Sequence, residues 1–322
     1  VIVVVAVIGA NDGTETTDYL IPYGVLKRSG VADVVALGTR AGPMTMMPSL
    51  TIVPEATTAQ FAQRYPDGAD YVIVPALHDP TDPAVSDFIR RQAALGATIV
   101  SICDGTLVMA NAGLLDGHRA TGHWFQIDSV AKAHPTMRRV RDRRYVADRG
   151  IVTTTGVSAS VPVSLALVEA IAGRDRAAAL AKEIGVRGWG AEHDSGAFHL
   201  IRDDVWMILG NLFVGLFDHE TVAVRVKEGA DVIAAAFMAD SYGRTFRTRV
   251  VVPGSGPIRT AEGLAIVPDA GGATADIALD LPVSQAARAL DIAIAGIRAR
   301  YGEATAAFVR VQLEDRGHTT GG

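Results

Sequence analysis

The sequence predicts an α/β fold built on a doubly wound, mostly parallel sheet, with a second and smaller α/β part behind it. Short runs rich in Val and Ile alternate with helical patterns over residues 1–186, which is typical of a parallel sheet covered by helices. A similar alternation begins again after residue 218. The chain has 322 residues, of which 49% are hydrophobic and 20% are charged, so it can bury a large core.

Strands and helices of the first part follow from apolar runs and from the residues that end helices. Val1–Ile8 is apolar and rich in Val, which is typical of a buried strand. Asp18–Ser29 is predicted as a helix that ends at Gly30, because glycine is common just after the last helical turn. The remaining elements, in order, are strands at Val34–Gly38 and Tyr71–Pro75, a helix at Pro83–Leu95, a strand at Ala97–Ile102, a helix at Gly105–Ala112, a strand at Ile151–Thr155 and a long helix that begins with Pro162–Ile171.

The second part contains the same kinds of element. They are predicted as a strand at Thr221–Val226, a helix at Ala230–Tyr242, a strand at Arg247–Val252 and one long helix at Ser284–Val311. The segment Gly263–Ala270 also echoes Ser49–Ala56. We interpret the second part as a degenerate partial repeat of the first; the alternative is that two α/β segments share a strand ending by chance. The predicted division is a cysteine-site domain at 1–186, a linker or lid at 187–218, the partial repeat at 219–316 and a tail at 317–322.

Charge and composition argue against several classes of function. A formal net charge of −5 and an isoelectric point near 5.9 disfavour nucleic acid or an anionic membrane surface as the main partner. No apolar run reaches the roughly 18 residues that span a membrane. A single cysteine forms no internal disulfide, which fits a cytoplasmic location. The given sequence begins without Met, which leaves open whether a leader precedes it. We expect a small-molecule partner.

Cys103 is the only cysteine, and it lies where a reactive thiol would be placed. It follows the strand Ala97–Ile102 and precedes Asp104 and the next helix. A strand–turn–helix of this kind exposes the side chain at the carboxyl edge of a sheet, where ligands bind. Helix N–H groups aimed at the sulfur favour the thiolate. The alternative is a buried core cysteine that behaves as a small hydrophobe.

Asp18 is the carboxylate that we expect beside the thiol. Its ordinary role would be to stabilise the start of its helix through the helix dipole. Its functional role would need the side chain to reach Cys103, where a carboxylic acid kept protonated by burial donates a hydrogen bond to the thiolate and relays a proton. Glu15, three residues earlier, is the rival carboxylate.

His123 and one loop complete the candidate site. A histidine near a thiol acts as a base or as the cationic partner of a thiolate; the alternative for His123 is a residue held by backbone contacts beside Trp124. No Asp or Asn is identifiable as its orienting partner, so the sequence does not support a full triad. The expected substrate-binding positions are those whose N–H groups could bind a developing oxyanion at the carboxyl edge, namely Ala76, Leu77, His78 and Asp104.

No metal and no cofactor are predicted. His193 and His199 have a spacing that fits no metal motif. The turn at Gly254–Pro257 is not a phosphate loop, because no strand–glycine–helix pattern surrounds it. The basic stretch Arg138–Arg144 is interrupted by Asp142 and is typical of a solvated surface.

Several of these pieces, in this order, resemble one known family. They are Asp18–Pro22, Ile102–Gly105, Ala112–Gly117 with Ala120–Trp124, and Thr153–Gly156 with Ser158 and Pro162. Residues 1 to 186 are similar to the ThiJ/PfpI superfamily, which has the flavodoxin-like, class I glutamine-amidotransferase-like fold. The similarity is closest to the amidotransferase-like domain of AraC-type regulators and to isonitrile hydratases.

The resemblance assigns roles to three residues. The family cysteine at the elbow is matched by Cys103, and the carboxylate before the Ile-Pro pair is matched by Asp18. Isonitrile hydratases carry an aspartate at that position, and many relatives carry a glutamate. Some members of the family carry a histidine after the elbow helix, and His123 matches it.

Three departures from the family pattern bear on function. Pro75–Leu77 stands where many members have paired glycines, which puts the oxyanion site in question. Asp104 stands where isonitrile hydratases have a threonine, and a carboxylate there would raise the pKa of the thiol unless it faces solvent. Residues 187–322 lack the basic helix-turn-helix pair of AraC-type regulators, so DNA binding is not implied.

Two functional hypotheses follow. The first is a cofactor-free, cysteine-dependent hydratase or hydrolase of a small electrophile, such as an isonitrile or a reactive carbonyl compound. The second is a ligand- or redox-sensing module whose pocket binds without turnover. The resemblance further implies a homodimer, since similar proteins usually pair and a half-repeat would leave a sheet edge exposed.

Overall fold

The computed structural model describes residues 2–198, 219–271 and 274–316. Its larger sheet has seven strands in the order β11-β12-β8-β7-β1-β3-β6. Neighbouring strands are parallel, except β11 and β12, which are antiparallel. The bounds are β1 (Val3–Gly9), β3 (Ala32–Gly38), β6 (Ala56–Thr57), β7 (Tyr71–Val74), β8 (Thr98–Ser101), β11 (Tyr145–Asp148) and β12 (Ile151–Thr154). The predicted doubly wound, mostly parallel α/β fold is therefore confirmed.

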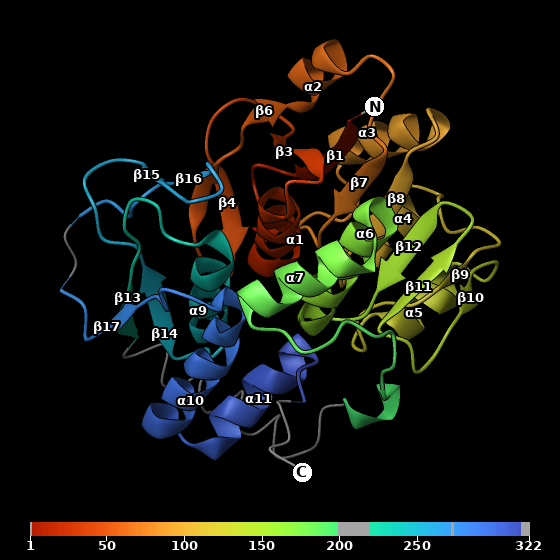
Figure 1. Ribbon diagram of the computed structural model, residues 1–322. Coiled ribbons are helices and arrows are strands. Elements are labelled where there is room, and N and C mark those ends of the chain that lie inside the picture. The colour runs from red at the N-terminus through yellow and green to blue at the C-terminus, as the bar shows by residue number, and fades with distance from the viewer. Residues whose placement is uncertain (1, 199–218, 272–273, 317–322) are drawn as a thin grey trace.

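Helices cover both faces of this sheet (Figure 1). Successive side chains of a strand point to opposite faces, so Val5 and Val7 of β1 join one apolar cluster while Ala6 and Ile8 join the other. The first cluster includes α1 (Thr16–Ser29), α6 (Ser160–Ala172) and α7 (Arg174–Ile184). The second includes α2 (Thr58–Arg64), α3 (Pro83–Ala94), α4 (Gly105–Asn111) and α5 (Ile127–Ala133). The carboxyl ends of the strands stay available for the loops that carry the candidate site.

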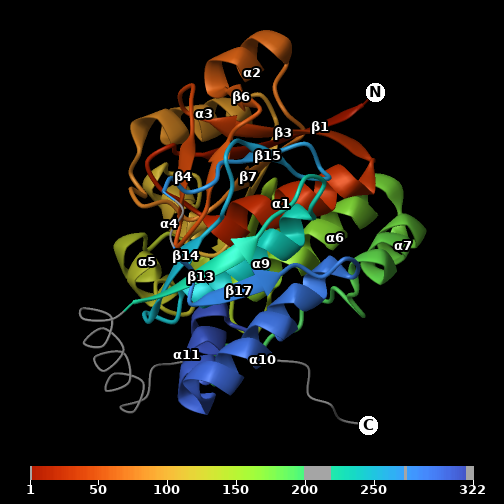
Figure 2. The same ribbon diagram turned by 90° about the vertical axis from the view of Figure 1, so that its left-hand side faces the viewer.

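The second part of the chain forms its own three-stranded parallel sheet, in the order β14-β13-β17 (Figure 2). The strands are β13 (Glu220–Arg225), β14 (Thr248–Val251) and β17 (Ile277–Asp280), and the last of these was not predicted. The helix α9 (Val232–Gly243) packs against α1 so closely that a Cβ on Gly24 would lie 2.7 Å from side-chain atoms of Val232 and Ile233. Glycine at this position therefore permits the close approach of the two helices.

A small five-stranded sheet, in the order β15-β16-β5-β4-β2, joins the two parts. Its strands are β2 (Thr14–Glu15), β4 (Met44–Met47), β5 (Thr51–Val53), β15 (Ile258–Arg259) and β16 (Ala265–Ile266). The two segments that echo each other in sequence meet here, because β5 and β16 pair in antiparallel fashion with Ile52 opposite Ile266. The interpretation of the second part as a repeat remains a prediction at this point.

The prediction of one long helix at Ser284–Val311 is wrong. The chain there forms a short 3₁₀ helix, η3 (Ala286–Arg288), and then two helices, α10 (Ala289–Tyr301) and α11 (Glu303–Leu313). Gly302 separates the two helices with φ 89°, a value that favours glycine and ends a right-handed helix. Gly173, with φ 87°, separates α6 from α7 in the same way, so the helix that begins at Pro162–Ile171 is also shorter than expected.

The remaining described elements are short. They are β9 (Arg119–Ala120), β10 (Arg138–Arg139), η1 (Val157–Ala159) and η2 (Ser195–Ala197). Within the part of the chain that the structure describes, no helix combines the length and apolarity needed to cross a bilayer. Val1, His199, most of the expected linker or lid (199–218) and the expected tail (317–322) lie outside the described residues.

Candidate active site

Cys103 lies on a sharp turn between β8 and α4, as the sequence predicts. Its φ is 54°, in the left-handed region that residues with a Cβ rarely adopt. The turn is held by the N–H of Cys103, which donates to the carbonyl oxygen of Thr155 at 3.0 Å, and by the N–H of Ile102, which donates to that of Val74 at 2.9 Å. Gly105 lies so close to β7 that a Cβ would come within 2.1 Å of the Val74 oxygen. Backbone hydrogen bonds and a required glycine thus fix the position of the thiol.

The thiol of Cys103 is buried rather than open. The residue is 7% exposed and belongs to the apolar cluster that contains β1 and α1. Burial raises the pKa of the thiol well above its ordinary value, and the neighbouring charges of Asp18, Asp104 and Glu15 raise it further. The positive charge of Arg244 lowers the same pKa without reversing its direction. The expectation that the N-terminus of α4 would favour the thiolate is therefore wrong, because one short helix does not offset burial and three nearby carboxyl groups.

Asp18 lies close enough to Cys103 for its charge to raise the pKa of the thiol. Its side chain is fully buried, and its Oδ2 accepts a hydrogen bond from the N–H of Ala76 at 3.1 Å. Its Oδ1 has no hydrogen-bond partner among the described residues. Burial, with the charge of Glu15 second, raises the pKa of Asp18 well above its usual range. The folded protein therefore holds the proton of Asp18 to a higher pH than a free aspartate does.

Glu15 is the N-cap residue of α1, so the rival carboxylate also belongs to the site. It accepts hydrogen bonds from the N–H of Asp18 at 2.5 Å and from the hydroxyl of Thr17 at 3.0 Å. Its other strong partner is Arg244, whose Nη2 lies 2.5 Å from Oε1. The carboxylate of Glu15 is thus held in one orientation by three donors.

Arg244 comes from the second part of the chain and was missed in the sequence. It follows α9, and its Nε donates to Asp240 at 2.8 Å while its Nη2 reaches Glu15. Burial works against its charge, but Asp240 and Glu15 outweigh burial and raise the pKa of Arg244. No local pattern marks this arginine, because its partner Glu15 is 229 residues away in sequence.

Asp104 and His123 lie with Cys103 in one cluster. One potential ligand atom from each of the three side chains lies within 4.8 Å of the others. Burial raises the pKa of Asp104, and the charge of His123 opposes this shift. Asp104 therefore faces the cluster rather than solvent, and it provides an acid beside His123 that the sequence did not reveal.

The ring of His123 is held by the second part of the chain. Its Nε2 donates to the carbonyl oxygen of Gln312 at 3.0 Å, and its Nδ1 accepts from the N–H of Phe125 at 3.4 Å. Both nitrogens therefore have partners other than the thiol. A metal ion bound by Cys103, Asp104 and His123 would have to displace one of these hydrogen bonds, and the absence of a metal site remains a prediction.

All four predicted substrate-binding residues line one cavity of about 450 Å³. Its walls include Glu15, Ala76, Leu77, His78, Asp104, Gln126, Arg244, Phe246 and Gln312. The volume lies within the range of pockets that hold small molecules. Polar groups of both parts of the chain therefore face a cavity of suitable size. Its lining includes Asp104 at the elbow, but it does not include Cys103, Asp18 or His123.

The backbone of the loop at residues 76–78 is already used in part. The N–H of Ala76 donates to Asp18, and the N–H of His78 donates to the carbonyl oxygen of Gly13 at 3.0 Å. Among the described residues, the N–H groups of Leu77 and Asp104 donate no hydrogen bond. Of the expected oxyanion donors, these two are left to meet a substrate.

Glu314, at the end of α11, ties the second part to the elbow region. Its carboxylate accepts from the N–H of Trp124 at 2.5 Å and from the N–H of Gly156 at 3.0 Å, and it lies 3.3 Å from Nε2 of His193. Burial opposes its ionisation, but the bond to His193, the charge of His123 and these N–H groups outweigh burial and lower the pKa of Glu314. His193 is thus already in contact with Glu314, and His199 lies outside the described residues.

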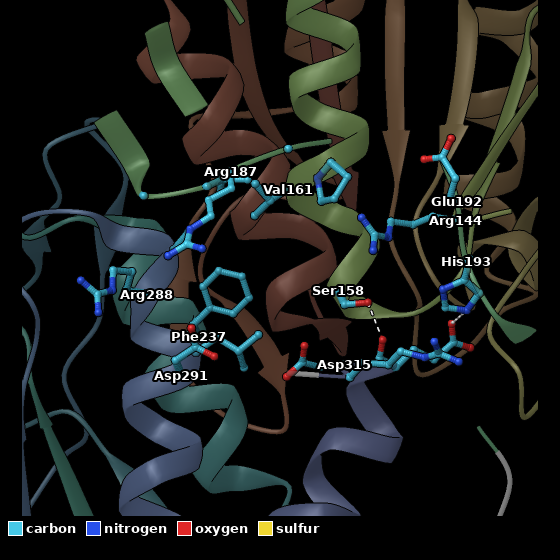
Figure 3. Close-up of a pocket in the computed structure, with 18 of the residues that line it drawn as sticks. Arg144, Ser158, Val161, Arg187, Glu192, His193, Phe237, Arg288, Asp291 and Asp315 are labelled. Carbon is cyan, nitrogen blue, oxygen red and sulfur yellow. Dashed lines mark hydrogen bonds and ion pairs between the residues drawn. The ribbon is translucent and has the colours of Figure 1, made fainter. Parts of the chain in front are cut away.

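A second cavity, of about 530 Å³, lies between the two parts of the chain (Figure 3). Its lining includes four arginines, Arg144, Arg187, Arg288 and Arg316, and five acidic residues, Glu192, Asp194, Asp291, Glu314 and Asp315. Positive and negative side chains are therefore mixed along its walls, and the lining does not select a ligand of one charge.

Comparisons with known proteins agree with the first part of this structure. The model of the DJ-1/PfpI family matches residues 3–170. Isonitrile hydratase of Pseudomonas putida is 38% identical over 97 residues, which are 30% of this chain and 41% of that protein. The HTH-type transcriptional regulator CdhR of Pseudomonas aeruginosa is 34% identical over 102 residues, which are 31% of this chain and 30% of that protein. The chain covers less than half the length of each of these relatives.

A solved structure shows the same fold. DJ-1beta of Drosophila melanogaster superposes with a TM-score of 0.53 and 25% sequence identity. The superposition covers 58% of this chain and 100% of that one. The remaining part of this chain is therefore an addition to the fold of that protein.

Proposed function

Because the chain belongs to the DJ-1/PfpI family, we propose that it is a cofactor-free, cysteine-dependent hydratase or hydrolase of a small electrophile, of the isonitrile or reactive-carbonyl type. The observation that carries the proposal is that Cys103, fixed on its elbow, lies within electrostatic reach of the buried Asp18, whose pKa burial raises. The neighbouring cavity of about 450 Å³ supports it, since this volume suits a small substrate.

The proposed reaction with an isonitrile uses both protons of this pair. The sulfur of Cys103 attacks the terminal carbon, Asp18 gives its proton to that carbon, and the carboxylate of Asp18 takes the proton that leaves the thiol. The product of this step is a thioimidate. Water then adds to its carbon, the C–S bond breaks, the sulfur regains a proton and an N-substituted formamide leaves. One water is consumed, and no oxidant or reductant is needed.

The protonated state of the thiol shapes this chemistry. The raised pKa of Cys103 means that the thiol is protonated before the substrate binds. Attack must therefore be coupled to removal of the S–H proton, which gives Asp18 a necessary role as a proton relay. Among the residues that the structure describes, the N–H groups of Leu77 and Asp104 donate to no acceptor, and they would meet negative charge that develops on a carbonyl substrate.

The test is a product assay with the full chain. Wild type incubated with simple alkyl isonitriles is expected to give the N-alkylformamide, detected by mass spectrometry. Cys103→Ser and Asp18→Asn are each expected to lower the rate at least about 100-fold, the usual size of a lost acid–base or nucleophilic group. Asp87→Asn, which changes an exposed carboxylate paired with Arg90, is the matched control and is expected to keep the wild-type rate.

Two results would contradict the proposal. One is the absence of product from isonitriles and from reactive dicarbonyl compounds under conditions where the substrate binds. The other is an unchanged rate in Asp18→Asn. That result would show that Asp18 is not the proton relay, although Cys103 could still be the nucleophile.

A second candidate function is a sensing module, and the buried thiol favours it. A thiol with a raised pKa and 7% exposure is slow to react, and redox sensors generally need an accessible thiolate. Ligand sensing therefore fits better than redox sensing. Saturable binding of an electrophile by calorimetry, without product and without loss of binding in Cys103→Ser, would support this alternative over the enzyme.

The proposal has consequences for partners and location. We place the protein in the cytoplasm, where a lone thiol stays reduced, with a small-molecule ligand and without nucleic acid. A homodimer, implied by the resemblance, is retained as part of the proposal. Sedimentation of the full chain measures it directly.

A further inference from the structure

Several elements of the second part have counterparts in the first. The strand order β3-β1-β7 of the first sheet has its counterpart in β14-β13-β17, with the central strand followed by α1 in one part and by α9 in the other. The helices that end each part also agree: η1, α6 and α7 have 3, 13 and 11 residues, and η3, α10 and α11 have the same lengths. The glycine between the two longer helices has φ 87° and ψ 165° in the first part and φ 89° and ψ 168° in the second.

Contacts between the two parts are reciprocal at α1 and α9. Glu15 is the N-cap of α1 and pairs with Arg244, which follows the last turn of α9. Asp231 is the N-cap of α9 and pairs with Arg28 in the last turn of α1. Each helix therefore offers its N-cap carboxylate to an arginine at the end of the other.

The same reciprocity appears where the terminal helices meet the opposite part. Gly185 follows α7, and a Cβ on it would lie 2.8 Å from Cβ of Gln285, the N-cap of η3. Glu314 follows α11, and its Cβ would lie 2.9 Å from a Cβ on Gly156, the N-cap of η1. When two residues touch across an interface and their counterparts touch as well, the interface has two-fold symmetry.

We infer that residues 219–316 act as an internal second subunit, related to the first part by a local two-fold axis, and that this part completes the Cys103 site with Arg244 as a positioning residue. The inference rests on the proposed role of Cys103 as the reactive group. The second part has no cysteine of its own, since the chain has one, and it contributes to the site of the first part instead.

The position of Arg244 explains how it acts through another residue. It lines the 450 Å³ cavity and holds Glu15, which in turn accepts the N–H of Asp18 at 2.5 Å. Its charge is also the one that lowers the pKa of the thiol against the three carboxyl groups nearby. Arg28, its counterpart, holds Asp231 and Glu262 in the second part, where there is no thiol.

This symmetry supplies a matched pair of variants. Arg244→Gln and Arg28→Gln each remove one arginine from the end of one of the two paired helices, but only Arg244 lies at the cysteine. The readout is the rate of Cys103 alkylation by iodoacetamide in the folded full chain, measured from pH 6 to 11, with circular dichroism to confirm folding. This readout needs no substrate, so it fails or succeeds separately from the product assay.

Arg244→Gln is expected to move the alkylation profile up by about one pH unit, so that the rate on the rising limb falls about tenfold, the size expected for losing a nearby opposite charge. Arg244→Lys, which keeps the charge, is expected to restore most of that loss, and Arg28→Gln is expected to leave the profile unchanged. Equal shifts in the two Gln variants, or no shift in Arg244→Gln, would overturn the inference.

Glu15→Gln keeps the test decisive if Arg244→Gln does not fold. It removes a carboxylate that raises the pKa of Cys103 while the charge of Arg244 remains, so the profile is expected to move down. A profile that moves up in Glu15→Gln contradicts the electrostatic role, because neither the loss of this negative charge nor a general loosening of the site raises the pKa of the thiol.

The covered face of α1 has one consequence for assembly. A homodimer of this chain must form on a face other than the one that α9 occupies.

Discussion

Arg244 and Glu15 form an ion pair of 2.5 Å that joins the two parts of the chain at the wall of the cavity of about 450 Å³. Both side chains are largely buried, and Asp240 holds the arginine from the other side. A buried ion pair is costly unless further hydrogen bonds satisfy both groups, and here Thr17 and the N–H of Asp18 do so for Glu15. The second part is thus joined to the site by a polar network rather than by apolar packing alone.

The alkylation profile of wild type tests the state of the thiol. Because burial raises the pKa of Cys103, its reaction with iodoacetamide in the folded protein is expected to be slow at pH 7 and to rise only at a pH above the value for a free cysteine, about 8.5. The same chain unfolded in urea serves as the control and is expected to titrate near that value. A folded profile with its midpoint below the unfolded one contradicts the assignment of a neutral thiol.

Asp18→Asn is expected to flatten the pH dependence of stability. The folded protein holds the Asp18 proton to a higher pH than the unfolded chain does, because burial and then Glu15 raise its pKa. This stabilising contribution is complete below the unfolded pKa of about 3.9 and is lost as the pH rises toward the raised value. Urea unfolding between pH 4 and 7 measures the slope, which should be shallower in the variant and unchanged in Asp87→Asn. Identical slopes in wild type and Asp18→Asn would count against the raised pKa.

Glu314→Gln is expected to lower the free energy of unfolding by about 1–3 kcal/mol at pH 7, the cost of weakening buried charge-assisted hydrogen bonds. The carboxylate accepts from Trp124 and Gly156 and pairs with His193, so an amide loses the charge that these groups meet. Its pKa is lowered in the folded state, so its contribution is present above the unfolded pKa and is lost as the pH falls through the folded one.

Glu303→Gln is the control for that experiment, because Glu303 begins the helix that Glu314 follows, α11, and is an exposed partner of Arg298 on α10. An exposed pair of this kind contributes less than about 1 kcal/mol. Equal losses in the two variants, measured by urea unfolding, would show that Glu314 has no special part in joining α11 to the elbow.

Gly105→Ala is expected to destabilise the fold and disturb the elbow. An added Cβ would lie 2.1 Å from the carbonyl oxygen of Val74, so the turn has to move, at a cost of about 1–3 kcal/mol typical of overpacking. Gly256→Ala is the control, because nothing lies within 4 Å of its Cβ position. Thermal unfolding checks both variants, and a Gly105→Ala protein as stable as wild type would mean that the turn is looser than the structure shows.

Most elements of the first part could be predicted because their signals are local. The strand before Cys103 and the helix ending at Gly30 are marked by apolar runs and by a glycine, and the structure places them within a few residues of the predicted bounds. The failure at Gly302 is also instructive. A single glycine inside an apolar helical pattern has two outcomes, continuation or a break, and packing against the other elements selects one of them.

The sequence by itself determined the fold class, the elbow at Cys103 and the presence of a carboxylate, Asp18, at the start of the first helix, because each depends on residues that are close together in the chain. Only the tertiary structure decided that the thiol is buried, that His123 binds the backbone of Gln312, and that Arg244 meets Glu15. These outcomes depend on which surfaces of two distant segments come into contact. Burial and charge at one atom are sums over everything that surrounds it, and most of what surrounds Cys103 is far away in the sequence.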